Sequence, residues 1–239
     1  MGSLQVTVID VGQGQSVLLT WEDKSYLVDC GGDSDKYAAN TVQQTLASMG
    51  IFYLDGLILT HYDRDHAGGV MPLLERVPAN TLYLPQIQDS GNIKEQLAEN
   101  YAPIIHWVEQ NAVVADGDGV LTLFPGSDPE SENESSMCVL FQRENCDILI
   151  AGDRGTDGEY ALMEETQLPK LELLIVGHHG SNTSSSIPFL LATMPEMAVV
   201  STGQTNRYQR PTQRVLQRFE AIECPVFSTA ESGTITFRR

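Results

Sequence analysis

The 239-residue sequence predicts an α/β (αββα) sandwich, in which two mixed β-sheets pack together and helices lie outside them. Short runs rich in β-branched residues recur along the whole chain, and Gly, Asp, Asn or Pro bound them, as is typical of strands. Apolar residues at helical spacing lie between some of these runs. Both halves of the chain show hairpins followed by strand–helix units, so two sheets are expected.

The expected strands are spread over the whole chain. In order they are Leu4–Val11, Gln15–Thr20, Tyr26–Asp29, Leu54–Thr60, Thr81–Leu84, Val120–Phe124, Met137–Gln142, Asp147–Ala151, Leu171–Val176, Met197–Thr202 and Thr234–Phe237. Helices are expected where apolar residues share one face, and these faces are formed by Val42, Leu46 and Met49, by Val70, Leu73 and Leu74, and by Val215, Leu216 and Phe219.

Domain organisation is expected to be simple, with one domain over residues 4–239 after a cloning remnant at residues 1–3. The acidic, Ser-rich stretch 126–136 is too short for a domain linker and is expected to be a loop. The cysteines lack CxxC spacing and lie in or beside apolar runs. They are expected to be buried free thiols, with one or two disulfides as the alternative, and they are Cys30, Cys138, Cys146 and Cys224.

The charge of the chain argues against a general nucleic-acid-binding protein. The sequence has 14 Lys and Arg against 32 Asp and Glu, a formal net charge of −18, whereas unspecific DNA affinity comes mostly from basic side chains. Bound metal cations can reverse the sign locally, so a phosphodiester remains a possible substrate. No run approaches the roughly 20 apolar residues of a membrane span, and no signal peptide is recognisable.

The first cluster of candidate functional residues directly follows an expected strand. It contains His61, Asp63, Asp65 and His66 within six residues. Imidazole and carboxylate groups are ligands that divalent first-row metals accept, so a metal site is predicted here. The alternative is a polar turn whose aspartates only cap the backbone.

A second cluster also follows an apolar strand and contains His178, His179, Ser181 and Asn182. A histidine at a strand end can complete a metal site, and the Ser-Asn-Thr-Ser run offers hydrogen-bond donors to an anion. His178 is favoured for the metal and His179 for orientation or substrate contact. Asp153 ends another apolar strand, and its carboxylate could bridge two metal ions.

The order of these motifs resembles the metallo-β-lactamase-fold hydrolases. More narrowly, the chain resembles the C-terminal domain of the ComEC family of bacterial competence DNA-uptake channel proteins. The broad resemblance is carried by Asp29-Cys-Gly31-Gly32, by residues 60–69, by Gly152-Asp153 and by residues 178–181, and the narrower one by residues 8–16, 133–140 and 201–208.

The resemblance implies an αββα fold with a dinuclear metal centre. His61 and Asp63 would bind the first metal, Asp65, His66 and His178 the second, and Asp153 would bridge both. The catalytic residues implied are Asp65, His66, Asp153 and His179. Substrate contacts are assigned to Asn133, Ser136, Ser181, Asn182, Asn206, Arg207 and Arg210.

Two departures from the broad family pattern and one from the ComEC-like pattern bear on this centre. Asp63 stands where that family usually has His, and the His of the next motif is absent near Asn133 and Ser136, either of which could reach the metal or the substrate. Arg210 stands where the ComEC-like pattern usually has His. For Arg207 and Arg210 a solvated loop is the alternative to a phosphate contact.

The expected cofactor is a pair of divalent ions. Carboxylate in place of imidazole at Asp63 makes the site richer in oxygen, which favours Mn²⁺, with Zn²⁺ or Mg²⁺ able to bind. A metal-bridged hydroxide would then attack the phosphorus. Asp10, Gln13 and Asp29 are interpreted as orienting or loop-shaping residues rather than ligands.

The predicted function is that of a nuclease domain which degrades one strand of incoming DNA during competence and transformation. Expected partners are single-stranded DNA and the membrane channel of the same parent protein, in the bacterial inner membrane with the domain facing outside or the periplasm. The isolated domain would be a soluble monomer. The alternatives are a free-standing hydrolase of a small phosphodiester or ester, and a degenerate domain that binds DNA or a partner without catalysis.

Overall fold

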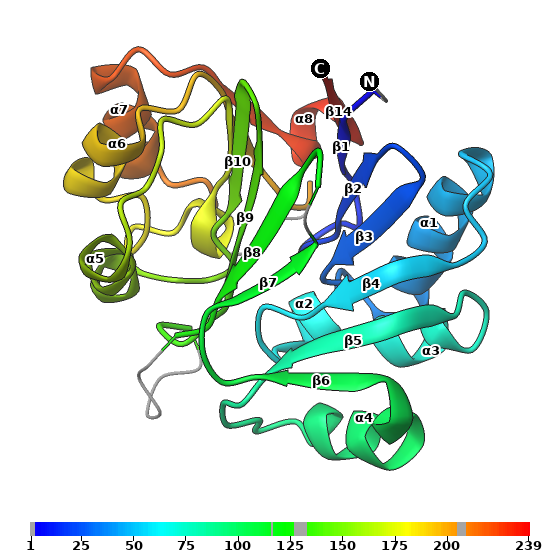
Figure 1. Cartoon of the computed structure of the whole chain (residues 1–239). Helices are drawn as coiled ribbons and strands as arrows, with labels where there is room; N and C mark the ends of the chain where they lie inside the picture. The colour runs from blue at the N-terminus through cyan, green and yellow to red at the C-terminus, as the bar shows by residue number, and fades with distance from the viewer. Residues whose placement is uncertain (1–2, 116, 127–132, 205–208) are drawn as a thin grey trace. The chain divides into compact units, whose positions relative to one another are not determined.

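The computed structural model describes residues 3–115, 117–126, 133–204 and 209–239. These residues form two compact units, and each unit contains a seven-stranded sheet (Figure 1). The first unit takes 3–107, 201–204 and 229–239 of the described residues, and the second takes the remainder. The predicted fold class, two mixed sheets with helices, is confirmed, whereas the single domain over residues 4–239 stays a prediction.

The first sheet has the strand order β14-β1-β2-β3-β4-β5-β6. The pairs from β14 to β3 are antiparallel, and β3, β4 and β5 run parallel to one another. The strands are β1 (Gln5–Val8), β2 (Val17–Trp21), β3 (Lys24–Val28), β4 (Leu54–Ile58), β5 (Ala79–Pro85), β6 (Ile105–Val108) and β14 (Ile235–Arg238).

The second sheet has the order β13-β12-β11-β10-β9-β8-β7. Strands β7 to β10 pair antiparallel, and β10 to β13 pair parallel. The strands are β7 (Ala112–Ala115), β8 (Val120–Phe124), β9 (Cys138–Arg143), β10 (Cys146–Ile150), β11 (Leu173–Ile175), β12 (Ala198–Val200) and β13 (Val226–Ser228).

Helices cover one face of the first sheet. Ala38, Val42 and Leu46 of α1 pack in one apolar core with Val70 and Leu73 of α3 and with side chains of β2 to β5. This burial follows from the helical spacing of the apolar residues. The helices of this unit are α1 (Asp35–Ser48), α2 (Arg64–Ala67), α3 (Val70–Leu74), α4 (Ile93–Tyr101) and α8 (Thr229–Ser232), with a 3₁₀ turn at Ala102–Ile104.

Helices also cover one face of the second sheet. Leu162 of α5, Phe189 of α6 and Phe219 of α7 share a core with apolar side chains of β8 to β12. The helices are α5 (Thr156–Glu165), α6 (Ile187–Thr193) and α7 (Gln213–Ala221), with a 3₁₀ turn at Gly177–Gly180. The predicted helical face of Val215 and Phe219 is buried, while Leu216 is half-buried.

Every predicted strand run contains a strand, but β6, β7 and β13 were missed. All three lie at sheet edges. An edge strand has a single neighbour and needs fewer apolar residues, so its periodicity is weak. Val113 of β7 is 61% exposed, which illustrates this. Helices α4, α5 and α6 were also missed, and the first two bury few apolar side chains, Leu97 in α4 and Leu162 in α5.

All four cysteines are buried and free, as the sequence predicted, so the disulfide alternative is wrong. Burial raises the pKa of the Cys30 thiol, which therefore stays protonated at neutral pH.

Candidate metal centre

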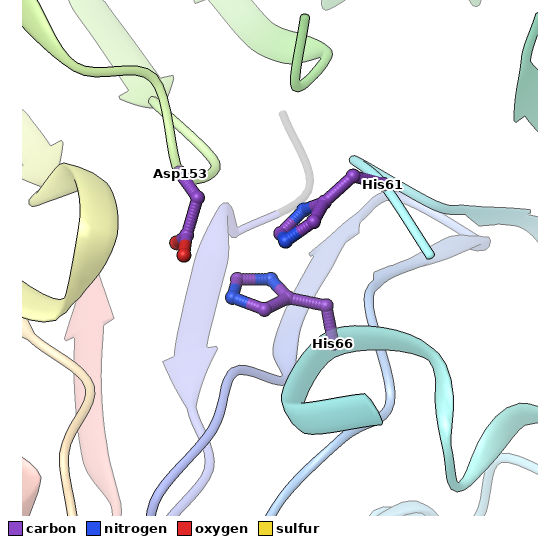
Figure 2. Close-up of side chains that lie close together, drawn as sticks. All are labelled: His61, His66 and Asp153. Carbon is purple, nitrogen blue, oxygen red and sulfur yellow. The ribbon is translucent and has the colours of Figure 1, made fainter. Parts of the chain in front are cut away.

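The parallel pairing of β3 with β4 positions the first cluster. Parallel strands end at the same edge of a sheet, so Asp29 after β3 lies beside the segment that follows β4. That segment carries His61, and the short helix α2 carries His66 (Figure 2). The two imidazole rings lie 4.2 Å apart between centroids, and both are fully buried.

Asp29 orients both histidines. Its Oδ2 accepts hydrogen bonds from His66 Nδ1, Thr60 Oγ1 and Gln15 Nε2, each at 2.8 Å, and its Oδ1 accepts from the Thr60 backbone at 2.8 Å. Because Thr60 Oγ1 donates to Asp29, its lone pair can accept from His61 Nδ1 at 3.0 Å. Asp29 therefore has the orienting contact that the sequence analysis assigned to it.

Glycine allows the close backbone approach that this network needs. A side chain at Gly31 would overlap the peptide between Asp65 and His66. Beside it, the Cys30 backbone N–H donates to the His66 carbonyl at 2.8 Å, and the Gln15 N–H donates to the Asp65 carbonyl at 2.9 Å. The α2 helix is thus fixed to the loops after β1 and β3 through its own backbone.

The donor set of this first cluster fits a divalent metal ion. Both Nδ1 atoms are engaged, so Nε2 is the nitrogen of each ring that is left to bind a metal, an arrangement common for metal-binding histidines. Asp65 offers a carboxylate oxygen within 4.8 Å of a ring nitrogen of His66. Asp63 Oδ2 lies 3.7 Å from His61 Nε2, and this side chain is 41% exposed.

The second cluster is built by the same topological rule. Strands β10 and β11 are parallel, so Asp153 after β10 lies beside the histidine pair after β11. The two Asp153 oxygens lie 3.9 Å from Nε2 of His178 and from Nε2 of His179. The His179 side chain is 1% exposed and that of His178 17%. Figure 2 draws Asp153 on its loop.

Buried contacts fix the Asp153 loop. The Asp153 backbone N–H donates to Ser136 Oγ at 2.9 Å, and Arg154 donates to the carbonyls of Ser136, Phe124 and Gly158. Arg154 is 2% exposed, and Ser136 is fully buried. Ser136 therefore has a structural contact, and its predicted contact with the substrate stays a prediction.

The remaining predicted substrate residues lie in several environments. Asn133 is half-buried and its carbonyl accepts from the Ser136 N–H, while Ser181 is buried and its Oγ accepts from Thr183 Oγ1. Asn182 is exposed and accepts from Thr212 Oγ1 at 2.7 Å. Asn206 and Arg207 lie outside the described residues.

Arg210 approaches the second cluster directly. Its Nη2 lies 3.1 Å from His178 Nε2, and Thr183 Oγ1 lies 3.3 Å from the Nδ1 of the same ring. A guanidinium can only donate, so this contact requires a lone pair on Nε2. Coordination of a metal by His178 Nε2 would then require Arg210 to move away.

Comparison with known proteins identifies the family. A family model described as the metallo-beta-lactamase superfamily matches residues 9–203. The chain belongs to that superfamily. This membership supports a metal-dependent hydrolase and implies divalent metal ions, in agreement with the donor chemistry of the two clusters.

Two curated relatives are similar over nearly the whole chain. ComE operon protein 3 of Bacillus subtilis is 31% identical over 98% of this chain, and Competence protein ComA of Neisseria gonorrhoeae is 34% identical over 97%. The chain spans about a third of each relative, 33% and 32% of their lengths. The predicted resemblance to the ComEC family is thereby confirmed.

The fold has a solved counterpart in the superfamily protein YhfI from Bacillus subtilis. That structure is 14% identical, has a TM-score of 0.67 and aligns over 100% of both chains. At this identity the likeness establishes the metallo-β-lactamase fold alone. Within the part of the chain that the structure describes, no helix combines the length and apolar character needed to cross a bilayer.

The separate roles predicted for the two adjacent histidines can be tested by single substitutions. If His178 binds metal, His178→Ala should weaken Mn²⁺ binding by at least about 100-fold, because loss of a residue that only orients a metal ligand already costs about 10–100-fold. His179→Ala should leave affinity within about threefold and lower turnover instead. Calorimetric titration with Mn²⁺ checks both, and a larger affinity loss in His179→Ala would reverse the assignment.

Sequence reasoning missed the polar residues that hold the two clusters in place. Gln15 and Thr60 are polar residues beside apolar strands, and both are buried. Because buried polar groups need hydrogen-bond partners, their position could have indicated that they bind a polar group such as Asp29. Arg154 follows Asp153 directly, but nothing in the local pattern indicated that it is buried.

Proposed function

We propose that this chain is a metal-dependent nuclease domain that hydrolyses phosphodiester bonds in single-stranded DNA. The observation that carries the proposal is the buried Asp29–His66 pair beside His61, since it prepares imidazole donors for a metal. The similarity to two competence proteins supplies the substrate class. One strand of incoming DNA would be degraded while the other passes into the cell.

The metal ligands in this proposal come from both clusters. His61 and Asp63 would bind one ion, and Asp65, His66 and His178 the other. Asp153 would bridge them. When bound, divalent ions lower the pKa of water and offset the charge of the phosphate.

The protein residues have their own roles in the proposed reaction. Asp29 and Thr60 keep the two imidazoles in the tautomer that presents Nε2. His179 would orient the scissile group, and the hydroxyl of Ser181 would donate to a phosphoryl oxygen. Arg210 would hold a flanking phosphate, because guanidinium matches phosphate geometry.

Manganese is the proposed native metal. Asp63 provides an oxygen where the broad superfamily usually has imidazole, and an oxygen-rich site suits Mn²⁺ better than Zn²⁺. Zn²⁺ and Mg²⁺ are expected to bind and to support less turnover.

The proposed setting rests on the similarity to the ComEC family of DNA-uptake channel proteins. We propose that the chain works beside a membrane channel in the same parent protein. We place that protein in the bacterial inner membrane with this domain facing outside or the periplasm, and we expect the isolated chain to be monomeric.

The net charge of −18 favours a second candidate, a hydrolase of small phosphodiesters or esters. A long polyanion would be repelled by the protein field beyond the metal centre, whereas a small substrate would not. A domain that only binds DNA or a partner is the remaining alternative, and it would keep its affinity in chelator.

The proposal is tested by adding Mn²⁺, Mg²⁺ or Zn²⁺ back to metal-stripped protein with end-labelled single-stranded DNA. We expect cleavage that is at least about tenfold faster with Mn²⁺ than with Zn²⁺. A chromogenic phosphodiester in parallel distinguishes the second candidate, which would cleave it and leave DNA intact. Absence of DNA cleavage with every metal, in protein that binds Mn²⁺, would reject the nuclease.

A further inference from the structure

The segment Ser181–Ser186, which follows the histidine pair, is held by a buried carboxylate. Glu159 of α5 is 3% exposed, and it accepts hydrogen bonds from the backbone N–H groups of Ser185 and Ser186, the latter at 2.8 Å. The Ser186 side chain also hydrogen-bonds to it. Ser185 has φ 55°, which turns the two successive N–H groups toward one acceptor.

A cation holds the carbonyl groups of the same segment. Arg218 of α7 donates from Nη1 to the carbonyls of Ser184 and Ser185 and from Nη2 to that of Asn182, at 3.1 Å for the last. The carboxylate thus satisfies backbone donors and the guanidinium satisfies backbone acceptors. The two side chains come from different helices and act on one short segment.

Hydrogen bonds connect this segment to the histidines. Ser184 Oγ donates to the Gly177 carbonyl at 2.7 Å, and the Ser181 N–H donates to the His178 carbonyl at 2.9 Å. His178 and His179 have φ 52° and 51°, a left-handed conformation that is costly for residues other than glycine. Such backbone persists only where the surroundings restrain it.

We propose that Glu159 and Arg218 are positioning residues, which hold the segment Ser181–Ser186 and through it keep His178 and His179 in their left-handed conformation. The inference rests on the proposed function for its catalytic meaning, since these histidines belong to the proposed metal centre. Neither residue contacts the histidines directly, so their effect passes through the segment.

The protonation of Glu159 provides a signal of its contact with the segment Ser181–Ser186. Burial raises the pKa of Glu159 from 4.5 to about 7, while the hydrogen bonds from Ser185 and Ser186 and the charge of Arg218 oppose the shift. Other titratable or charged groups near Glu159 are Cys138 of β9, which interacts with it electrostatically, and two side chains at the neighbouring Gly158. Arg154 donates to the Gly158 carbonyl, and the Glu134 carboxylate accepts from the Gly158 N–H at 2.6 Å.

The sign of the pH dependence follows from the raised pKa. Between pH 4.5 and about 7 the folded protein binds more protons at Glu159 than the unfolded chain does, so unfolding becomes easier as pH rises through this window. The ionised carboxylate nevertheless makes the stronger hydrogen bonds to Ser185 and Ser186. These two amides should therefore report the protonation of Glu159.

The first test needs neither metal nor substrate. In the full chain, the amide proton shifts of Ser185 and Ser186 should titrate with a midpoint near pH 7, and Glu159→Gln should abolish that titration. Glu164→Gln, an exposed position on the same helix, is the matched control and should leave it intact. Titration that persists in Glu159→Gln, or its absence in the wild type, would overturn the proposal.

The second test asks whether Glu159 and Arg218, which we call the clamp, restrain the histidines. Amide hydrogen exchange at His178 and His179 should be about tenfold faster in Glu159→Gln, and Mn²⁺ affinity should fall about tenfold, as for other residues that orient metal ligands. Arg218→Lys keeps the positive charge but loses the planar guanidinium, whose two nitrogens bind different carbonyl groups. It should show a smaller effect in the same direction. Should Glu159→Gln fail to fold, Arg218→Lys still decides the question.

The two tests separate this inference from the proposed function. A wild-type chain that binds no Mn²⁺ would contradict the metal centre, while the Ser185 and Ser186 titration would still test the clamp. Unchanged exchange at both histidines in Glu159→Gln and in Arg218→Lys would reject the positioning role even if the enzyme proves to be a nuclease.

Discussion

Replacing Asp65 with alanine is expected to reduce Mn²⁺-dependent cleavage of single-stranded DNA by more than about 100-fold. Partners that merely orient a metal ligand typically cost 10–100-fold, so loss of a proposed ligand should cost at least the upper value. The fold should survive, because Asp65 is half-buried and alanine keeps the backbone carbonyl that accepts the hydrogen bond from the Gln15 N–H.

The measurement pairs initial rates of DNA cleavage with thermal unfolding of the same preparations. Asp23→Ala removes one carboxylate at an exposed turn and should match the wild type in both, which controls for the change in net charge. Cleavage that survives Asp65→Ala would mean that the metal centre is assigned to the wrong residues. A parallel drop in melting temperature would mean that Asp65 acts through stability.

The motifs of the candidate centre could be predicted because they are local. His61, Asp63, Asp65 and His66 lie within eight residues of the end of β4, and the parallel strand pairs bring such ends to one edge of a sheet. The partners that hold these motifs are distant in sequence. Asp29 and His66 are 37 positions apart, and no local spacing indicates that they form a buried pair.

The elements that escaped prediction share a physical cause. Strands β6, β7 and β13 lie at sheet edges, and their side chains need less apolar character because one side has no neighbouring strand. Helix α5 was missed since its buried residues include Gly158 and Glu159 rather than a run of apolar ones. Burial of a charged residue is decided by distant partners, which periodicity does not register.

Replacing Asp29 with asparagine is expected to lower the free energy of unfolding by about 2–4 kcal/mol, because hydrogen bonds to a buried charge are worth about 1.5–3 kcal/mol. Asparagine is the informative substitution, since Asp29 has φ 61° and asparagine tolerates this left-handed backbone well. Four donors face the carboxylate. An amide turns its own N–H groups toward at least one of them in either orientation.

The same substitution should also weaken Mn²⁺ binding 10–100-fold, because the His66 ring would lose the charged acceptor that fixes its tautomer. Chemical denaturation without metal gives the stability change, and titration with Mn²⁺ gives the affinity. Asp33→Asn is the matched control, because Asp33 is exposed and its carboxylate accepts a hydrogen bond from the Gln13 backbone N–H. This substitution is expected to lower the free energy of unfolding by less than about 1 kcal/mol. If Asp29→Asn lost stability but kept the wild-type affinity, the buried carboxylate would support the fold without preparing His66 for a metal, and the main argument for the metal centre would fail.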